Sequence, residues 1–145
     1  MPRRLTRALV GMLDAVGRVT GRKAPGPAHL ARGRTGEDQA YFYLRKRGYV
    51  IVARNFRSPR CKGEIDMVGW DGDVLCFIEV KTRSSADVAP AEAAVDEDKR
   101  QNLRLTAREY LRQLRSAPAC RFDVLSVYCD NKSTPQITLF RDAFS

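Results

Sequence analysis

Two apolar runs with a short polar break between them dominate the middle of the chain. The first spans residues 63–70, the second spans residues 73–83, and Asp71-Gly72 separates them. An Asp-Gly step between two such runs is a strong signal for a β-hairpin. The second run is rich in β-branched and aromatic residues, as buried strands are. Residues 63–83 are therefore predicted to form a hairpin around which the fold is organised.

Apolar periodicity elsewhere predicts two helices and three further strands. Helical spacing recurs in residues 36–47, with Thr35 as N-cap and Gly48 as the C-terminal stop, and in residues 93–115. Residues 142–144 are predicted to add one helical turn. The three strands are predicted over residues 49–55, 120–128 and 136–140. The order α-β-β-β-α-β-β predicts an α/β domain with a mixed central sheet flanked by helices.

The hairpin register decides which side chains lie together. With Asp71-Gly72 as a two-residue turn, Glu64 lies opposite Glu79. Asp66 is then a diagonal neighbour of Glu79, at about 7 Å between backbones. Side chains alternate between the faces of a sheet, so a slip of one residue would separate these acids. The predicted register places five side chains on one face: Glu64, Asp66, Phe77, Glu79 and Lys81.

Three carboxylates and a lysine on one face indicate a cation site. Carboxylates this close repel one another, and a divalent cation relieves the repulsion. Mg²⁺ prefers such oxygen ligands, and the carbonyl of Val80 is a further candidate ligand. Lys81 is placed to orient an attacking water or to offset charge on a phosphate. The alternative is a surface ion-pair cluster, and the spacing of acids and lysine around an apolar strand favours the site.

The same residues carry a resemblance to a known family. Gly63-Glu64-Ile65-Asp66, followed by Phe77-Ile78-Glu79-Val80-Lys81-Thr82-Arg83, resembles the core of the PD-(D/E)xK nuclease superfamily. Over residues 34–144 the chain more closely resembles the bacterial YraN family of small nuclease-like proteins, itself similar to archaeal Holliday-junction resolvases. One departure is Ile65, which stands where many superfamily members have proline.

The resemblance implies a single restriction-endonuclease-like domain over residues 34–145, with Mg²⁺ or Mn²⁺ and no small-molecule cofactor. Glu37 falls on the helix acid of the resolvase-like proteins, although an acid near a helix start also complements the helix dipole. The implied catalytic residues are Glu37, Asp66, Glu79 and Lys81, and the candidate metal ligands are Asp66, Glu79, Val80, Glu37 and Glu64.

Two functional hypotheses follow. The first is metal-dependent phosphodiester hydrolysis on DNA, including branched DNA, by an endonuclease of the resolvase-like branch. The second is a non-catalytic nucleic-acid-binding or adaptor protein on a nuclease-like scaffold. Resolvase-like enzymes cut two strands symmetrically, so the resemblance also implies a homodimer.

Positive charge is concentrated at the N-terminus. The net charge is +9, and residues 1–34 hold eight basic residues and one acidic residue, whereas the rest holds 18 basic and 16 acidic residues. The excess belongs mostly to a basic arm, residues 1–33, and favours contact with nucleic acid or another anionic surface. Within the domain, five cations are candidates for phosphate contact, although solvated side chains are the alternative: Arg57, Arg60, Lys62, Lys99 and Arg100.

The arm itself divides into two parts. Apolar residues in residues 1–20 have helical spacing, which predicts an amphipathic helix suited to a membrane surface, to the domain or to a partner. Residues 21–33 are rich in glycine and proline and are predicted to be a flexible linker. A disordered basic extension is the alternative for the whole arm. A second flexible segment, residues 84–91, is predicted to cover the acidic site.

Length and cysteine content limit the remaining possibilities. The 145 residues suit one domain, and no apolar run has the length of a membrane span. The four cysteines lack CxxC spacing and His29 is the only histidine, which argues against a structural zinc site. Cys76 and Cys120 fall in strands and are predicted to be core thiols. This pattern is typical of a reducing cytoplasm.

Overall fold

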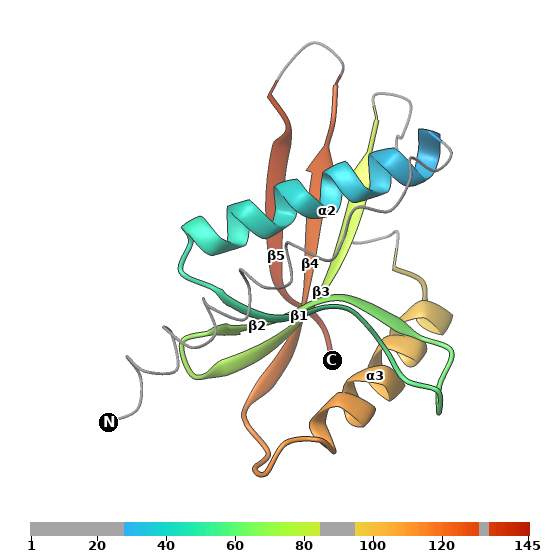
Figure 1. The fold of residues 1–145 in the computed structure, drawn as a ribbon, viewed down its shortest axis with the longest axis vertical. Helices are drawn as coiled ribbons and strands as arrows, with labels where there is room; N and C mark the ends of the chain where they lie inside the picture. Colours follow the sequence, from blue (N-terminus) through green and yellow to red (C-terminus); the bar gives the residue numbers. More distant parts are fainter. Residues whose placement is uncertain (1–27, 85–94, 131–133) are drawn as a thin grey trace, which may run out of the picture.

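The predicted order of helices and strands is confirmed by the computed structural model, which describes residues 28–84, 95–130 and 134–145. The amphipathic helix expected over residues 1–20 and nearly all of the expected cover over residues 84–91 lie outside the described residues. The elements are α2 (Ala28–Lys46), β1 (Val50–Arg57), β2 (Glu64–Asp71), β3 (Val74–Arg83), α3 (Glu97–Leu111), β4 (Cys120–Tyr128) and β5 (Gln136–Phe144) (Figure 1).

The strands form one mixed sheet in the order β1-β2-β3-β4-β5. All neighbouring strands are antiparallel except β3 and β4, which are parallel. A parallel pair needs a crossover connection, and α3 lies within it. The mixed sheet flanked by helices is therefore confirmed.

Each helix covers its own face of the sheet. Along β3, Cys76 and Ile78 belong to one hydrophobic cluster with residues of α2, whereas Leu75 and Phe77 belong to a second cluster with residues of α3. Because side chains on a strand alternate between faces, the two clusters lie on opposite sides of the sheet. In Figure 1, α2 crosses β4 and β5, and α3 lies apart from it at the lower right.

The ends of both helices differ from the prediction. The first helix, α2, begins at Ala28, so Thr35 lies inside it and residues 28–33, expected in the linker, are helical. Gly36 lets this helix approach β3, since a Cβ there would lie 2.0 Å from Thr82 Oγ1. The second helix, α3, is shorter than residues 93–115 at both ends. Asp96 caps its start, accepting from the Lys99 N–H at 2.8 Å, and the helix ends at Leu111, with Arg112 as its C-cap.

The hairpin turn lies one residue later than predicted. Asp71 pairs with Val74, so Gly72 and Asp73 form the turn, and the predicted turn at Asp71-Gly72 is wrong. Gly72 has φ +61°, and a type II′ turn requires glycine in that first central position. Moving the turn by one residue shifts the pairing by two, which preserves the face of every side chain. In this register Glu64 no longer lies opposite Glu79, so that predicted pairing is wrong as well.

Two details of the C-terminal half correct the prediction. The last strand, β5, extends to Phe144, so the helical turn expected at residues 142–144 is wrong, and Asp142 instead has φ +50° within the strand. Cys76 is buried as predicted, whereas Cys120 is exposed at the first residue of β4, which neither hydrophobic cluster includes. All four cysteines are free thiols.

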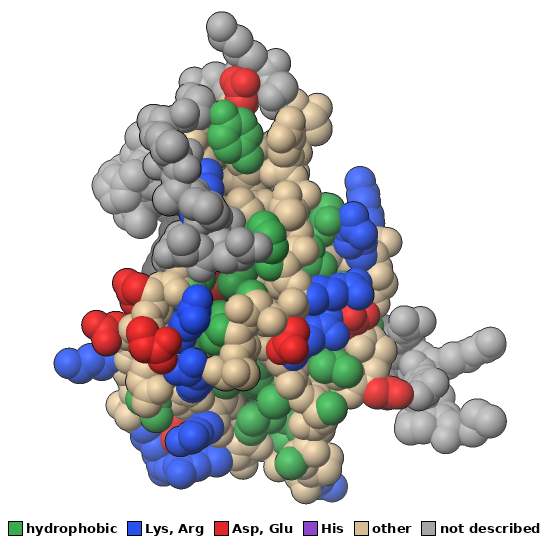
Figure 2. All heavy atoms as spheres, turned by 180° about the vertical axis from the view of Figure 1, so that it is seen from behind, with side chains coloured by type: hydrophobic (Ala, Val, Ile, Leu, Met, Phe, Trp, Pro, Cys, Tyr) green, Lys and Arg blue, Asp and Glu red, His purple; other side chains and the backbone are tan. Residues whose placement is uncertain are grey.

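The surface of the domain mixes charges of both signs. Basic and acidic side chains lie next to one another over the face seen in Figure 2, among scattered hydrophobic groups. Within the described ranges, helices long and apolar enough to cross a membrane are absent.

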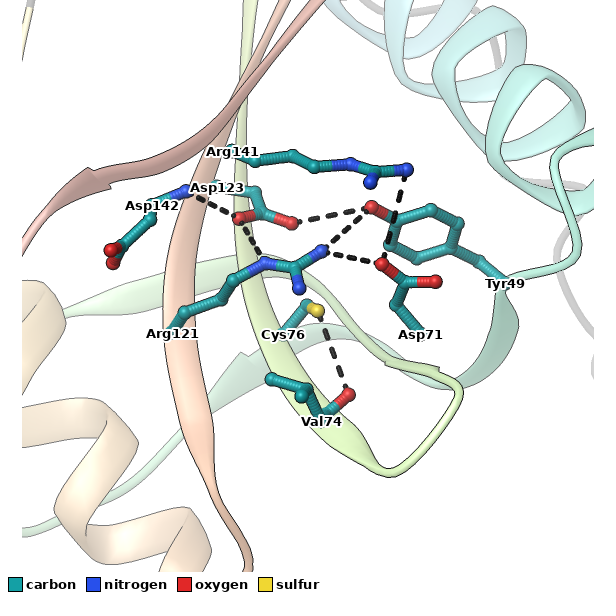
Figure 3. Close-up of polar contacts among 8 residues, drawn as sticks. All are labelled: Tyr49, Asp71, Val74, Cys76, Arg121, Asp123, Arg141 and Asp142. Atoms are coloured by element: carbon teal, nitrogen blue, oxygen red, sulfur yellow. Dashed lines mark hydrogen bonds and ion pairs between the residues drawn. The ribbon is translucent and has the colours of Figure 1, made fainter.

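A buried ion network joins the hairpin end of the sheet to β4 and β5 (Figure 3). Asp123 is fully buried, and its Oδ1 accepts from Arg121 Nε at 2.9 Å and from the Asp142 N–H at 3.0 Å. Arg121 also donates to Asp71 Oδ2 at 2.7 Å and to the Tyr49 hydroxyl at 3.0 Å. Burial, and then the charge of Asp123, raises the pKa of Tyr49 to about 12, so its hydroxyl stays protonated. The buried charge of Asp123 is thus fully paired, as a structural role requires.

Candidate active site

The two candidate metal-binding acids meet where β2 and β3 separate. The ladder between these strands ends at the pair Met67 and Ile78, and beyond it Asp66 Oδ2 accepts the Val80 N–H at 2.7 Å. On an extended strand the N–H and C=O of one residue point the same way, so the Val80 carbonyl also faces β2. The hairpin thus presents the Asp66 carboxylate and the Val80 carbonyl at one opening of the sheet.

Glu79 is a buried carboxylate with unequal oxygens. Its residue is only 4% exposed. Its Oε1 lies 3.0 Å from Lys81 Nζ and 3.3 Å from Lys99 Nζ, which reaches it from the first turn of α3. Its Oε2 is buried and no N–H group donates to it, while the Asp66 carboxyl interacts with Glu79 through a hydrogen bond. A buried charged oxygen that no N–H group reaches is costly, so this atom marks a place where a ligand would be favourable.

The pKa of Asp66 reflects its burial and the acidic groups around it. Burial, and then the negative charge of Glu79, raises the pKa of Asp66 far above its usual range, while the hydrogen bond from the Val80 N–H opposes the rise. The charge of Glu37 raises it further. Asp66 therefore keeps its proton at neutral pH unless a cation offsets the neighbouring charge.

This raised pKa gives a signed prediction for stability. In EDTA, Asp66→Asn is expected to raise the free energy of unfolding at pH 8 by at least about 1 kcal/mol. Folded wild type holds a proton on Asp66 that the unfolded chain releases above the ordinary aspartate pKa of 3.8, so its stability falls as pH rises toward the raised pKa. Asparagine does not titrate and escapes this loss. Urea denaturation at pH 5 and pH 8 measures the effect.

The control for this stability prediction is Asp38→Asn. Asp38 is an exposed acid that pairs with Arg54 at 2.8 Å. Its replacement should change stability by less than about 1 kcal/mol at either pH. A gain in Asp66→Asn that is no larger at pH 8 than at pH 5 would contradict the prediction.

Glu37 and Glu64 flank the opening and share one partner. Asn55 Nδ2 lies 3.4 Å from Glu37 Oε2 and 3.2 Å from Glu64 Oε1, and Glu64 also pairs with Arg57. Asn55 has φ +52°, a left-handed conformation that asparagine tolerates better than most residues. Burial raises the pKa of Glu37, against the hydrogen bond from Asn55.

The candidate ligands are therefore not one compact cluster. Among the described residues, no three His, Cys, Asp or Glu side chains are gathered as a metal site. Asp66 and Glu79 form an interacting pair, with the Val80 carbonyl beside Asp66. Glu37 and Glu64 are held at the rim by Asn55. Such a pair with further outer groups suits a cation that keeps part of its water.

Only some of the candidate phosphate contacts lie together. Arg57, Lys62 and Lys99 line one pocket of about 360 Å³ between the β1–β2 turn and α3. Arg60 is in the same turn, with its N–H bonded to Ser58 Oγ at 3.2 Å, but is not among the lining residues. Arg100 is directed elsewhere, since its Nε donates to the Val95 carbonyl at 3.0 Å and its guanidinium lies over the Phe144 ring.

Comparison with known proteins identifies the family of this chain. The family model described as "Uncharacterised protein family UPF0102" matches residues 36–127. The chain belongs to the UPF0102 family. A UPF0102 protein of Koribacter versatilis is 57% identical over 118 residues, covering 81% of this chain and 82% of the relative. Another, from Solibacter usitatus, is 50% identical over 113 residues, covering 77% of this chain and 84% of the relative. A third, from Rhodococcus opacus, is 41% identical over 117 residues, covering 80% of this chain and 98% of the relative.

Family membership confirms the resemblance to the YraN-like proteins. The UPF0102 match contains every candidate catalytic residue and both sides of the pocket, and it ends before β5.

Two features of this UPF0102 site were missed from the sequence. Asn55 falls at the end of a predicted strand, and its neighbours Arg54 and Phe56 give no signal of the left-handed backbone conformation that it adopts. Lys99 is predicted to contact phosphate, whereas in the structure it pairs with Glu79. No spacing rule gives that contact, because it depends on how α3 packs against the sheet.

Proposed function

We propose that this UPF0102 protein is a metal-dependent phosphodiesterase that acts on DNA, as an endonuclease of the resolvase-like branch. The observation that carries the proposal is the buried Oε2 of Glu79, to which no N–H group donates, beside an Asp66 carboxyl of raised pKa. Mg²⁺ commonly binds through one or two carboxylates and retains several waters. Asp66, Glu79 and the Val80 carbonyl therefore suit Mg²⁺ or Mn²⁺.

The roles of the side chains follow from their contacts. A bound Mg²⁺ or Mn²⁺ would supply charge stabilisation at the phosphate and a more acidic water. Lys81 holds Glu79 Oε1 at 3.0 Å and is close enough to orient the attacking water or offset phosphate charge. Glu37 and Glu64, fixed by Asn55, would act as outer ligands through water.

The test is cleavage of a DNA panel by the full-length protein. The panel contains linear duplex, single-stranded, flap and four-way-junction DNA, each with Mg²⁺, with Mn²⁺ or with EDTA. Cleavage of at least one substrate that requires the divalent cation is expected. Intact DNA in every reaction would reject the proposal. By analogy with resolvase-like enzymes, we also propose that the active form is a homodimer and acts in the cytoplasm, where the four free thiols stay reduced.

A non-catalytic nucleic-acid-binding or adaptor role is the second candidate. It is favoured by the near balance of 18 basic and 16 acidic residues after residue 34 and by the absence of a three-residue ligand cluster in the described ranges. Thermal unfolding with millimolar Mg²⁺ or Mn²⁺ separates the two, because a ligand of the folded state must raise its stability. No shift, with or without DNA, would favour the adaptor.

The basic arm is expected to provide most non-specific attraction to DNA. Residues 1–27 hold six basic residues and one acidic residue, and a chain that starts at Ala28 keeps all of α2. If half of these cations contact phosphates, the truncation should flatten the slope of log affinity against log salt by about 2 to 3 units. Turnover at saturating DNA should stay nearly unchanged. Fluorescence anisotropy at several salt concentrations measures the slope, and an unchanged slope would assign the attraction to the domain.

A further inference from the structure

Lys99 belongs to two sites at once. It lies in the first turn of α3, where its N–H is fixed by the Asp96 cap, and its side chain is 36% exposed. Its ammonium lies 3.3 Å from Glu79 Oε1, the oxygen that Lys81 already contacts at 3.0 Å. Two ammonium groups therefore share one oxygen of Glu79, while no N–H group donates to the other oxygen.

The same lysine lines the neighbouring pocket. That pocket of about 360 Å³ carries three cations, Arg57, Lys62 and Lys99, and one acid, Glu64, which already pairs with Arg57. The hydroxyl of Ser58 and the amide of Asn102 add hydrogen-bonding groups to its wall. Such a lining favours an anion with several acceptor oxygens, as a phosphodiester has.

The shape of this pocket is set by a close approach of the β1–β2 turn to α3. A Cβ on Gly63 would lie 2.0 Å from Thr106 Oγ1 and 2.7 Å from the Asn102 carbonyl. Only glycine therefore allows the turn to approach this far. Thr106 is itself fully buried, and its hydroxyl donates to the Asn102 carbonyl at 2.8 Å. The turn is therefore packed directly against α3, and the two lysines add long side chains to the wall that this contact forms.

We propose that Lys99 is an exchangeable counter-ion that couples metal binding to DNA binding. Without a divalent cation, its ammonium neutralises Glu79. When a divalent cation takes over the charge of Glu79, the ammonium turns to a DNA phosphate in the adjoining pocket. Lys81 remains on Glu79, so the second ammonium is the one that can leave. The inference rests on the proposed function, since it requires a cation at Glu79 and DNA as the ligand.

The coupling has a reciprocal consequence. If metal frees Lys99 for phosphate, metal must tighten DNA binding, and DNA must tighten metal binding by the same factor. Lys99→Met removes the competitor for Glu79 and the phosphate ligand together. Its metal affinity without DNA should therefore rise, while its DNA affinity in the presence of metal should fall.

The experiment compares full-length wild type with Lys99→Met, Lys62→Met and Lys99→Arg. Calorimetry measures Mn²⁺ binding without DNA, and anisotropy measures binding of a short duplex in Ca²⁺ and in EDTA. Lys99→Met is expected to bind Mn²⁺ at least about fivefold more tightly than wild type. Ca²⁺ raises the DNA affinity of wild type, and the factor of this increase should be at least about fivefold smaller in Lys99→Met. Lys62→Met removes the same charge from the pocket without touching Glu79, so it should weaken DNA binding and leave Mn²⁺ affinity within about twofold. Lys99→Arg retains the charge and should bind Mn²⁺ nearly as wild type does.

The outcomes separate this inference from the proposed function. Wild type that binds Mn²⁺, together with a Lys99→Met protein of equal or weaker Mn²⁺ affinity, overturns the inference and leaves the proposed function standing. Tighter Mn²⁺ binding by Lys99→Met with an unchanged gain in DNA affinity overturns the coupling. Wild type that binds no Mn²⁺ and cleaves no DNA overturns both.

Discussion

A Glu79→Gln protein is expected to cleave DNA more than about a hundredfold more slowly than wild type, because loss of even an outer partner of a metal site costs up to about a hundredfold. Glutamine keeps the shape of the side chain but replaces the carboxylate, including the buried Oε2 to which no N–H group donates, by a neutral amide. The fold should persist, since both ammonium groups that face Glu79 belong to partly exposed lysines. Single-turnover rates at saturating DNA measure the loss.

The control for Glu79→Gln is Glu109→Gln. Glu109 undergoes the same chemical change near the end of α3, where it pairs with Arg112 at 2.9 Å. Its cleavage rate should match that of wild type. Glu79→Ala serves as a second variant, and Asp66→Ala and Lys81→Ala should lose cleavage as well. Cleavage by Glu79→Ala within tenfold of wild type would remove Glu79 from the proposed mechanism.

The association of Asp66 with Glu79 could be predicted because it depends on which face of the sheet each side chain occupies, not on which residues pair exactly. The turn was placed one residue too early, yet that error shifts the register by two, and a shift of two leaves each side chain on its face. The predicted proximity of Asp66 and Glu79 therefore survived an error in the hairpin. An error of one residue in one strand would have destroyed it.

Contacts between distant elements could not be predicted in the same way. Lys99 reaches Glu79 because α3 packs across the sheet, and Asn55 joins Glu37 to Glu64 through a backbone conformation that local propensity does not specify. The start of α2 was missed for a related reason. Glycine and proline before residue 34 argue for a linker by propensity, whereas residues 28–33 continue the helix that packs on β3.

Asp123 illustrates what the sequence can and cannot predict about a buried charge. An acid in an apolar run signals a buried charge with a partner, but the run does not say which partner. The structure supplies three donors to Asp123: Arg121 from the same strand, the Tyr49 hydroxyl and the Asp142 N–H. Arg121 in turn donates to Asp71 and to Tyr49. Asp123 pairs with Ile78, next to Glu79 along β3, but it contacts Tyr49 on the α2 face of the sheet, whereas Glu79 contacts Lys99 of α3. Its effect on stability can therefore be measured apart from the proposed catalysis.

Asp123→Ala is expected to lower the free energy of unfolding by about 3 to 5 kcal/mol, the usual cost of removing one partner from a buried ion pair. Asp123 is fully buried, and its loss leaves the Arg121 guanidinium and the Asp142 N–H short of an acceptor. A domain of this size is stable by only about 5 to 15 kcal/mol, so the variant should lose a large part of its stability. Urea denaturation monitored by circular dichroism gives the difference.

The surface pair of Glu109 and Arg112 provides the comparison for Asp123→Ala. Their side chains are 17% and 67% exposed, and Glu109→Ala should cost less than about 1 kcal/mol. Arg121→Met, which leaves Asp123 buried without its cation, should be as damaging as Asp123→Ala, and the double variant should cost less than the sum of the two because both changes break one network. A loss below about 1 kcal/mol in Asp123→Ala, or strict additivity in the double variant, would show that these contacts do not act as a unit.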